Sequence, residues 1–113
     1  MSGKFVLKST GKGKFSFNLK AGNGRKILTS ESYMTKAAAL DGIESVRVNA
    51  MLEGNFERRT GKNRQPYFVL KAINQEVIGK SELYISARNM EKGIASVKAN
   101  AVSAGLEGLT LKK

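Results

Sequence analysis

The chain contains two copies of one segment, and this duplication constrains its fold more than any other feature of the sequence. When residues 3–50 are placed on residues 54–101 without a gap, 17 of the 48 pairs are identical. Two copies are too few for a solenoid, which needs at least about three repeats to bury a continuous core. Because one copy alone would bury too little surface, we expect both to share one core around a pseudo-twofold axis. We predict a single domain over residues 1–113, a monomer whose repeats mimic a dimer, with residues 102–113 as a C-terminal tail.

Hydrophobic alternation predicts strands in the first half of each copy. Phe15, Phe17 and Leu19 alternate with polar residues, which is typical of a strand with one buried face. The same pattern predicts strands near residues 5–8, 15–20, 27–30, 56–59, 67–72 and 77–81.

Asparagines predict local backbone geometry at two places in each copy. Asn23-Gly24 is a strong hairpin signal, because both residues tolerate positive φ. Asn74-Gln75 holds the same place in the second copy, where it is a weaker signal and points to a longer loop. Asn49 and Asn100 fall near the ends of the expected helices, where asparagine accepts left-handed geometry.

The second half of each copy has the periodicity of a helix. Thr35 and Ser86 are suitable N-caps for the two helices. Apolar residues then recur at helical spacing, namely Ala39, Ile43, Val46 and Ala50 in the first copy and Met90, Ile94, Val97 and Ala101 in the second. Gly42 and Gly93 lie beside these stripes, although glycine costs about 1 kcal/mol in a helix interior. We therefore expect each helix to approach the sheet or its twin closely at the glycine.

These elements predict an α+β fold. Two tandem β-β-β-α(-β) repeats would form one antiparallel sheet of about six to eight strands, with two helices on one face. The tail contains Leu106, Leu109 and Leu111 and is apolar enough to dock on the sheet as an extra strand.

The repeated segments also resemble a known family. GKFSFNLKAGNGRKILTSESYMTKAAALDGIESVRVNA and PYFVLKAINQEVIGKSELYISARNMEKGIASVKANA are similar to the repeat of the YegP-like family of uncharacterised bacterial proteins. The shared pieces are F-x-L-K-A-x-N, S-E-x-Y and G-I-x-S-V-[KR]-x-N-[AG]. The resemblance implies two β-β-β-α-β units in a single antiparallel sheet, with C-terminal strands exchanged between the units. It also implies that relatives with a single repeat form the same fold as homodimers. It implies no activity and no functional residues.

Composition excludes several classes of site. The sequence has no cysteine and no histidine, so it can form no disulfide, zinc finger, or Cys–His or Ser–His dyad. Asp41 is the only aspartate, and no acidic cluster has metal-ligand spacing. We predict no catalytic, cofactor-binding or metal-binding residues, and hence a protein that is not an enzyme. Apolar runs are too short for a signal peptide or a membrane span, which favours a cytoplasmic protein without a membrane partner.

The net charge of +11 is concentrated in the strand regions. Residues 1–26 hold seven basic residues and no acidic one, and residues 54–71 hold five basic residues and one acidic residue. Alternation directs part of this charge to the sheet face opposite the helices, where we expect Lys4, Lys8, Lys20, Arg59, Tyr67 and Lys71. Such a face attracts phosphates, but it also keeps an open sheet soluble and its edges unpaired. We predict a binding or interaction module whose partner is unknown. The alternative is that this basic face binds nucleic acid, or else an acidic protein.

Two other paired motifs have a structural and a chemical interpretation. The glycine-rich tips at residues 10–14 and 60–64 lack the spacing and the strand-to-helix context of a phosphate loop, so we interpret them as hairpin turns. Glu31 with Tyr33, and Glu82 with Tyr84, could act as acid–base pairs. We favour a structural role, in which Ser and Glu satisfy backbone amides and each tyrosine packs with its hydroxyl bonded.

Overall fold

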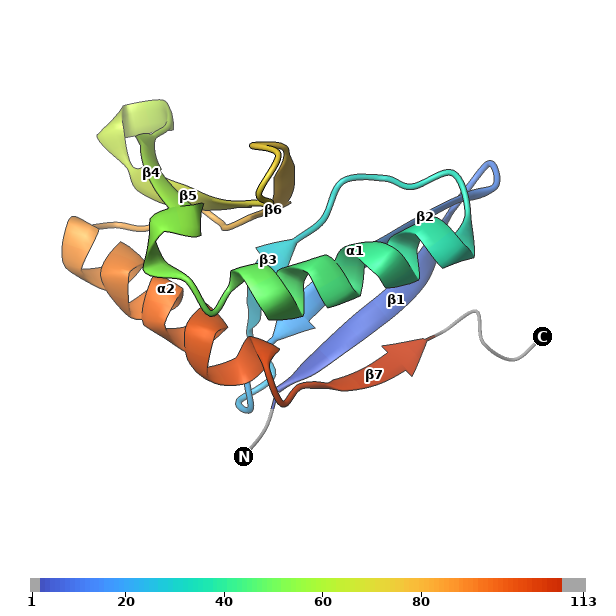
Figure 1. Cartoon of the computed structure of the whole chain (residues 1–113). Helices are drawn as coiled ribbons and strands as arrows, with labels where there is room; N and C mark the ends of the chain where they lie inside the picture. The colour runs from blue at the N-terminus through green and yellow to red at the C-terminus, as the bar shows by residue number, and fades with distance from the viewer. Residues whose placement is uncertain (1–2, 109–113) are drawn as a thin grey trace.

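The computed structural model describes residues 3–108 and consists of one sheet and two helices (Figure 1). The strands are β1 (Lys4–Gly11), β2 (Lys14–Lys20), β3 (Lys26–Thr29), β4 (Phe56–Thr60), β5 (Pro66–Lys71), β6 (Val77–Lys80) and β7 (Gly105–Gly108). The helices are α1 (Lys36–Asn49) and α2 (Ala87–Ala101), and η1 (Glu53–Asn55) and η2 (Lys62–Arg64) are single 3-10 turns. Each repeat contributes three strands followed by a helix, which confirms the predicted α+β tandem fold.

The strands follow the order β4-β5-β6-β3-β2-β1-β7. Every neighbouring pair is antiparallel except β1 and β7, which are parallel with Lys4 opposite Gly105, so the sheet is mixed. Because β7 follows α2, the last strand of the second repeat pairs with the first strand of the first repeat, as the exchange of C-terminal strands implies. Leu106 lies in β7 and is half-exposed, whereas Leu109 and Leu111 lie outside the described residues.

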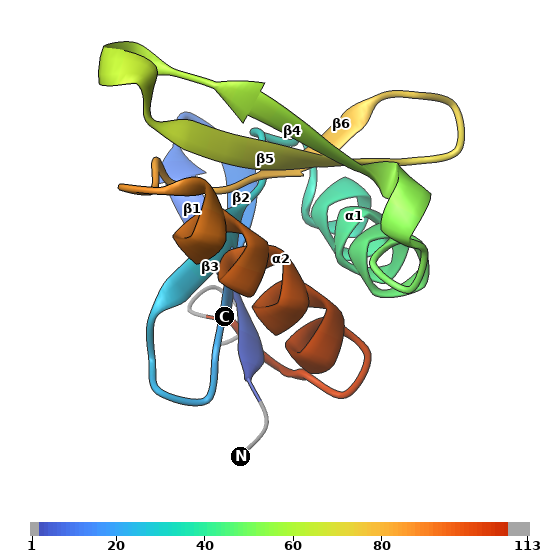
Figure 2. The same ribbon diagram turned by 90° about the vertical axis from the view of Figure 1, so that its left-hand side faces the viewer.

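A pseudo-twofold axis passes through the middle of the sheet. Thr29 in β3 lies directly opposite Lys80 in β6, and these residues hold equivalent positions in the two repeats. The axis puts both helices on the same face, where each contacts strands of both repeats. Figure 2 shows the strong twist of the sheet, with β4 and β5 running across the helices while β2 and β3 run steeply past them.

The core is one apolar cluster that both repeats build in the same way. Phe5 meets Phe17 edge to face with ring centres 5.9 Å apart, and Phe56 meets Phe68 at 5.8 Å. All four rings are buried between the sheet and the helices. Edge-to-face pairs of this kind add about 0.5–1.5 kcal/mol to the free energy gained from burying their area.

Both helices begin at the predicted N-caps. Thr35 Oγ1 accepts a hydrogen bond from the amide of Ala38 at 3.0 Å, and Ser86 Oγ accepts one from the amide of Asn89 at 3.1 Å. Each cap satisfies one of the amides that a helix N-terminus leaves without a partner, which stabilises the helix by about 1 kcal/mol.

The prediction of left-handed geometry at the helix-end asparagines is wrong. Asn49 and Asn100 lie within the helices, and neither has a positive φ. Their Nδ2 groups donate instead to the carbonyls of Ser45 at 2.8 Å and Ser96 at 2.7 Å. Asparagine is retained here because its side chain can bond to the backbone one turn earlier.

The two strand-connecting turns have the same length, so the longer loop expected at Asn74-Gln75 is not formed. Gly24 has φ +87° and Gln75 has φ +75°, and their amides each donate at 2.9 Å, to Ala21 and Ala72. The side chain of Asn74 accepts a hydrogen bond two residues on, and this Asx-type bond holds the turn without glycine.

The axis brings two unlike residues together beneath the join between β3 and β6. Leu28 is buried and occupies the position equivalent to Gly79. A Cβ added to Gly79 would lie 2.6 Å from Leu28 Cγ and 3.1 Å from Leu28 Cδ1. The space at the axis therefore has room for only one of the two equivalent side chains, and Leu28 fills it.

This arrangement predicts the outcome of a swap. Leu28→Gly should lower the free energy of unfolding by about 3–5 kcal/mol because it leaves a cavity, and Gly79→Leu by about 1–3 kcal/mol because it overpacks the site. The double variant should recover most of the loss, since the axis lets a leucine introduced on β6 fill the space above a glycine on β3. Urea denaturation measures all four proteins, and additive losses in the double variant would contradict the proposed symmetry.

Candidate functional site: the open face of the sheet

The face of the sheet opposite both described helices carries most of the candidate residues, and we call it the open face. Strand alternation assigns residues to it, because Phe5, Phe17 and Phe68 point into the core and their neighbours point away. The open face comprises Lys4, Val6, Lys8, Ser16, Asn18, Lys20, Lys26, Thr29, Glu57, Arg59, Tyr67, Val69, Lys71 and Lys80. All six residues singled out from the sequence lie on it.

Two basic pairs on the open face are related by the pseudo-twofold axis. Lys8 in β1 is equivalent to Arg59 in β4, and Lys20 in β2 is equivalent to Lys71 in β5. Within β1 and β2, Lys4 lies directly opposite Lys20. The cations therefore form two groups on either side of the axis rather than one continuous stripe.

The centre of the open face carries one cation, Lys80, which lies opposite Thr29 at the axis. Asn18 and Val69 hold equivalent positions near the axis, and both are buried. Asn18 Oδ1 accepts a hydrogen bond from Thr29 Oγ1 at 3.0 Å. A ligand approaching this face would meet Lys80 at the centre and the two basic groups at the flanks.

Glu57 partly neutralises the basic group on the β4–β5 side. Its Oε2 accepts a hydrogen bond from Arg59 Nε at 2.9 Å, and its Oε1 forms an ion pair with Lys71 Nζ. The guanidinium of Arg59, and then the ammonium of Lys71, lower the pKa of Glu57 from 4.5 to about 2. Its equivalent in the first repeat is Val6, so the β1–β2 side has no matching carboxylate at this place.

Lys80 belongs to the open face although sequence reasoning missed it. Its Nζ lies 5.5 Å from the centre of the Tyr67 ring, in a cation–π contact. Ile78 and Gly79 are both buried because β6 has an irregular register, so simple alternation does not assign the face of Lys80. The register opposite Val69 places it.

Tyr67 is the one aromatic residue among those assigned to the open face. Lys80 covers part of its ring, and its equivalent in the first repeat is Ser16. A platform for base stacking normally presents several aromatic rings. The open face is therefore suited to contacts with charge rather than with bases.

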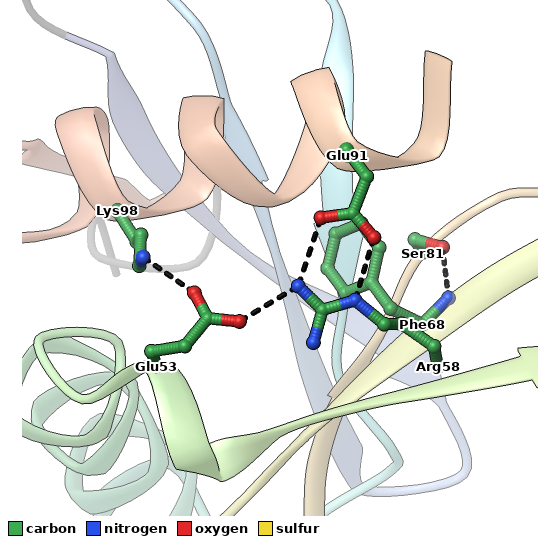
Figure 3. A network of polar contacts seen from close by, with 6 residues as sticks. All are labelled: Glu53, Arg58, Phe68, Ser81, Glu91 and Lys98. Carbon is green, nitrogen blue, oxygen red and sulfur yellow. Dashed lines mark hydrogen bonds and ion pairs between the residues drawn. The ribbon is translucent and has the colours of Figure 1, made fainter. Parts of the chain in front are cut away.

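Arg58 belongs to a separate network on the helix side of β4 (Figure 3). Its Nε and Nη2 bond Glu91 of α2 at 2.6 and 2.8 Å, and its Nη2 also bonds Glu53 of η1 at 2.7 Å. Lys98 Nζ reaches the other oxygen of Glu53 at 2.6 Å. Hydrogen bonds from Lys98 and Arg58 lower the pKa of Glu53, and Arg58 lowers the pKa of Glu91. The ion pairs of Arg58 link β4 to α2, so its positive charge is not available to a partner on the open face.

Arg47 makes the corresponding link in the other half of the molecule. It is equivalent to Lys98, and its Nη1 donates to the carbonyl of Ala104 at 2.7 Å, within the segment that follows α2. Its guanidinium also lies 5.0 Å from the centre of the Phe5 ring. A basic residue on each helix thus holds the segment that follows the other helix.

The serines of the two S-E-x-Y segments have equivalent structural roles. Ser30 Oγ accepts from the amide of Phe17 at 2.9 Å, and Ser81 Oγ accepts from the amide of Phe68 at 3.0 Å (Figure 3). Each hydroxyl then donates to the carbonyl of the following glutamate at 2.8 Å. The glutamates are exposed, so the serines, and not the carboxylates, satisfy the nearby backbone amides.

The tyrosines of these segments pack against the helices. Tyr33 stacks on Phe17 at 6.1 Å and Tyr84 stacks on Phe68 at 6.2 Å. A Cβ on Gly42 would lie 2.8 Å from Tyr33 Cζ, which explains the glycine in the helix. Burial raises the pKa of Tyr33, and the carboxylates of Glu31 and Glu76 raise it further. The phenol is therefore even less able than an ordinary tyrosine to lose its proton near neutral pH.

The remaining motifs show no separate site. The glycine-rich tips join β1 to β2 and β4 to β5, and both connections are hairpins. Within residues 3–108, no three acidic side chains gather into a group that could hold a metal ion. None of the helices in that range is long and apolar enough to span a membrane.

Comparison with known proteins identifies relatives along nearly the whole chain. Residues 11–57 and 62–107 each match the family described as Domain of unknown function (DUF1508). The chain is 50% identical to the UPF0339 protein YegP of Escherichia coli strain K12 over 103 residues, which are 91% of this chain and 94% of that protein. It is 51% identical over 106 residues to a UPF0339 protein of Pseudomonas aeruginosa, covering 94% of this chain and 96% of the relative.

Solved structures of relatives have the same fold. The solution NMR structure of a UPF0339 protein from Shewanella oneidensis gives a TM-score of 0.92 at 44% identity, over 99% of this chain and 95% of that one. The solution NMR structure of yegP from E. coli, described as a protein of unknown function, gives a TM-score of 0.90 at 47% identity, over 96% of this chain and 94% of that one.

The low pKa of Glu57 predicts a specific loss of stability in acid. A carboxyl whose pKa is lower in the folded protein stabilises the fold above its unfolded pKa, and this contribution disappears as pH falls through the folded value. For Glu57 that window runs from 4.5 down to about 2. Glu57→Gln should therefore flatten the fall in Tm between those pH values, as followed by circular dichroism.

A matched variant checks the cause of that effect. Arg59→Gln/Lys71→Gln removes both ion-pair partners of Glu57 and lets its pKa return toward the usual value. This variant should therefore flatten the same part of the plot of Tm against pH. A fall in Tm for Glu57→Gln as steep as that of the unaltered protein would show that this carboxyl does not contribute.

Proposed function

The chain belongs to the UPF0339 (YegP) family, which is described as being of unknown function, and we propose that it binds the phosphate backbone of nucleic acid through its open face. The observation that carries the proposal is the placement of Lys8 with Lys20, and of Arg59 with Lys71, in equivalent groups across the pseudo-twofold axis. Basic groups that neutralise phosphates release condensed counterions, and this release supplies sequence-independent affinity.

The symmetry of the two groups favours a duplex over a single strand. The antiparallel strands of a duplex are themselves related by twofold axes, so a protein twofold can present the same contacts to both backbones. Single-strand binding normally adds aromatic stacking, whereas Tyr67 is partly covered by Lys80 and has Ser16 as its equivalent. The proposed contact is with phosphates, so it carries no base preference of its own.

Glu57 would compete with a bound phosphate for Arg59 and Lys71. Its carboxylate holds Arg59 and Lys71, and a phosphate would have to share or displace it. The β1–β2 group has no acid at the equivalent place, since that residue is Val6. We infer that Lys8 and Lys20 make the stronger phosphate contacts.

The proposal includes a non-enzymatic role and a cytoplasmic location, where a nucleic acid partner would be accessible. The packing of Tyr33 and Tyr84 on buried phenylalanines supports a structural role for the S-E-x-Y segments. Serine hydroxyls bonded to the backbone support the same interpretation.

A titration tests the proposal. Fluorescence anisotropy with mixed-sequence duplex DNA, duplex RNA and single strands should show duplex binding that weakens between about 50 and 200 mM salt. Lys8→Gln/Arg59→Gln should weaken binding and reduce the slope of log K against log salt by about 2, one for each lost phosphate contact. Glu57→Gln should strengthen binding.

Lys36→Gln/Arg88→Gln is the matched control, because it removes the same charge from the beginnings of the two helices. Its salt slope should equal that of the unaltered protein. No binding to any of the nucleic acids at low salt would refute the proposal. If the control weakened binding as much as Lys8→Gln/Arg59→Gln, the interaction would be explained by net charge alone. If the protein bound single strands more tightly than duplexes, the proposed duplex geometry would be refuted.

A further inference from the structure

A hollow of about 380 Å³ lies between the two repeats, beside α2. Three segments form it, namely the β2–β3 turn of the first repeat, the segment between β6 and α2, and one side of α2. The lining residues are Ala21, Asn23, Arg25, Lys26, Ile27, Glu82, Leu83, Tyr84, Asn89, Lys92, Gly93 and Ser96. Pockets for small molecules begin at about 300 Å³, so the hollow is large enough for a small metabolite.

The charged lining of the hollow is predominantly basic. Arg25, Lys26 and Lys92 line it together with a single acid, Glu82. Within residues 3–108, the ion pairs involve other basic residues, and none is formed by these three. Lys26 lies opposite Lys20 in the register of β2 and β3, so its side chain belongs to the open face. Arg25 and Lys92, from two separate segments, therefore line one cavity in which Glu82 is the single acid among the lining residues.

Tyr84 supplies a rigid aromatic wall. Its ring is stacked on buried Phe68 at 6.2 Å and 14°, and it lies against Gly93 of α2. Burial and the nearby Glu82 raise the pKa of Tyr84, and Arg25 acts in the opposite direction. The phenol is thus held in place as a neutral group, beside the apolar side chains of Ile27 and Leu83.

The equivalent place in the other half of the molecule has the opposite charge. The repeat relates Arg25 to Glu76 and Lys92 to Asp41, while Tyr84 corresponds to Tyr33. The charged residues at the twelve equivalent positions are Glu31, Asp41 and Glu76. The carboxylates of Glu31 and Glu76 are close enough to raise the pKa of Tyr33. The charged residues at the positions that line the hollow are therefore mainly basic in one half of the molecule and acidic at the equivalent positions of the other.

We propose that the hollow at Tyr84 binds a small organic anion through a phosphate or carboxylate group. Arg25 and Lys92 contact the anionic group, and the apolar part of the molecule lies against the Tyr84 ring and Ile27. Charge-assisted hydrogen bonds from arginine and lysine are the usual means of holding such groups. The acidic counterpart excludes the same molecule, so one copy of the repeat has become a binding site and the other has not.

The experiment is an NMR titration of the full chain with pyrophosphate, citrate and inorganic phosphate as probes. Saturable amide shifts should occur at residues 21–27, 82–84 and 89–96. The equivalent amides at residues 72–78, 31–33 and 38–45 are an internal control and should not move. Preference for pyrophosphate or for citrate distinguishes a phosphate ligand from a carboxylate ligand.

Variants that exchange residues between the hollow and its counterpart test the assignment without introducing foreign residues. Arg25→Glu/Lys92→Asp places in the hollow the residues that the other repeat carries, and it should weaken binding by about tenfold or more for each cation lost. Glu76→Arg/Asp41→Lys should produce new shifts at the counterpart site. Lys8→Gln/Arg59→Gln, on the open face, should leave anion binding unchanged.

Three results would overturn the inference. One is the absence of saturable shifts with all three probes, and another is shifts of equal size at both sites. The third is unchanged affinity in Arg25→Glu/Lys92→Asp. Because Arg25 and Lys92 lie outside the open face, failure of the anion titration and failure of nucleic acid binding are separate outcomes.

Discussion

The join between β3 and β6 is the contact on which the rest of the structure depends, because it turns two three-stranded units into one sheet. A single opposed pair, Thr29 with Lys80, marks this join. The ladder itself is short, so the two repeats are held together mainly by the helices beneath it, each of which contacts strands of both copies. Leu28 filling the space above Gly79 completes this packing. Separating the repeats would expose the apolar faces of both helices, so the molecule should unfold as one unit.

The two copies share one backbone fold, and their side chains differ mainly outside the core, with Leu28 and Gly79 at the join as an exception. The phenylalanine pairs, the serine-to-backbone bonds and the stacked tyrosines are the same in both halves. Several of the differences concern charge. Arg58 faces α2 where the first repeat has Leu7, and Arg25 occupies the place of Glu76. Features present in both copies therefore serve the fold or, like the basic pairs of the open face, a contact that itself has twofold symmetry, whereas Arg25 is a candidate for a site that only one copy forms.

The sequence was informative wherever structure depends on neighbours in the chain. The helices, their caps at Thr35 and Ser86, and the need for Gly42 follow from local spacing and residue chemistry. Predictions were wrong where a side chain had an alternative, as when Asn49 bonded to the preceding turn instead of adopting positive φ. The face of Lys80 and the hollow beside Tyr84 were not predictable, because the first depends on an irregular register and the second on segments from both repeats.

The pairing of β7 with β1 has a consequence for the nascent protein. These strands lie at opposite ends of the described chain, with Lys4 opposite Gly105 and Leu7 opposite Gly108. During synthesis the outer edge of β1 has no partner until β7 has left the ribosome, and an unpaired edge can recruit a strand from another chain. Lysine on an edge strand opposes such recruitment, and Lys4 and Lys8 both lie on β1. The charge on this strand would thus protect the protein from aggregation before the sheet is complete.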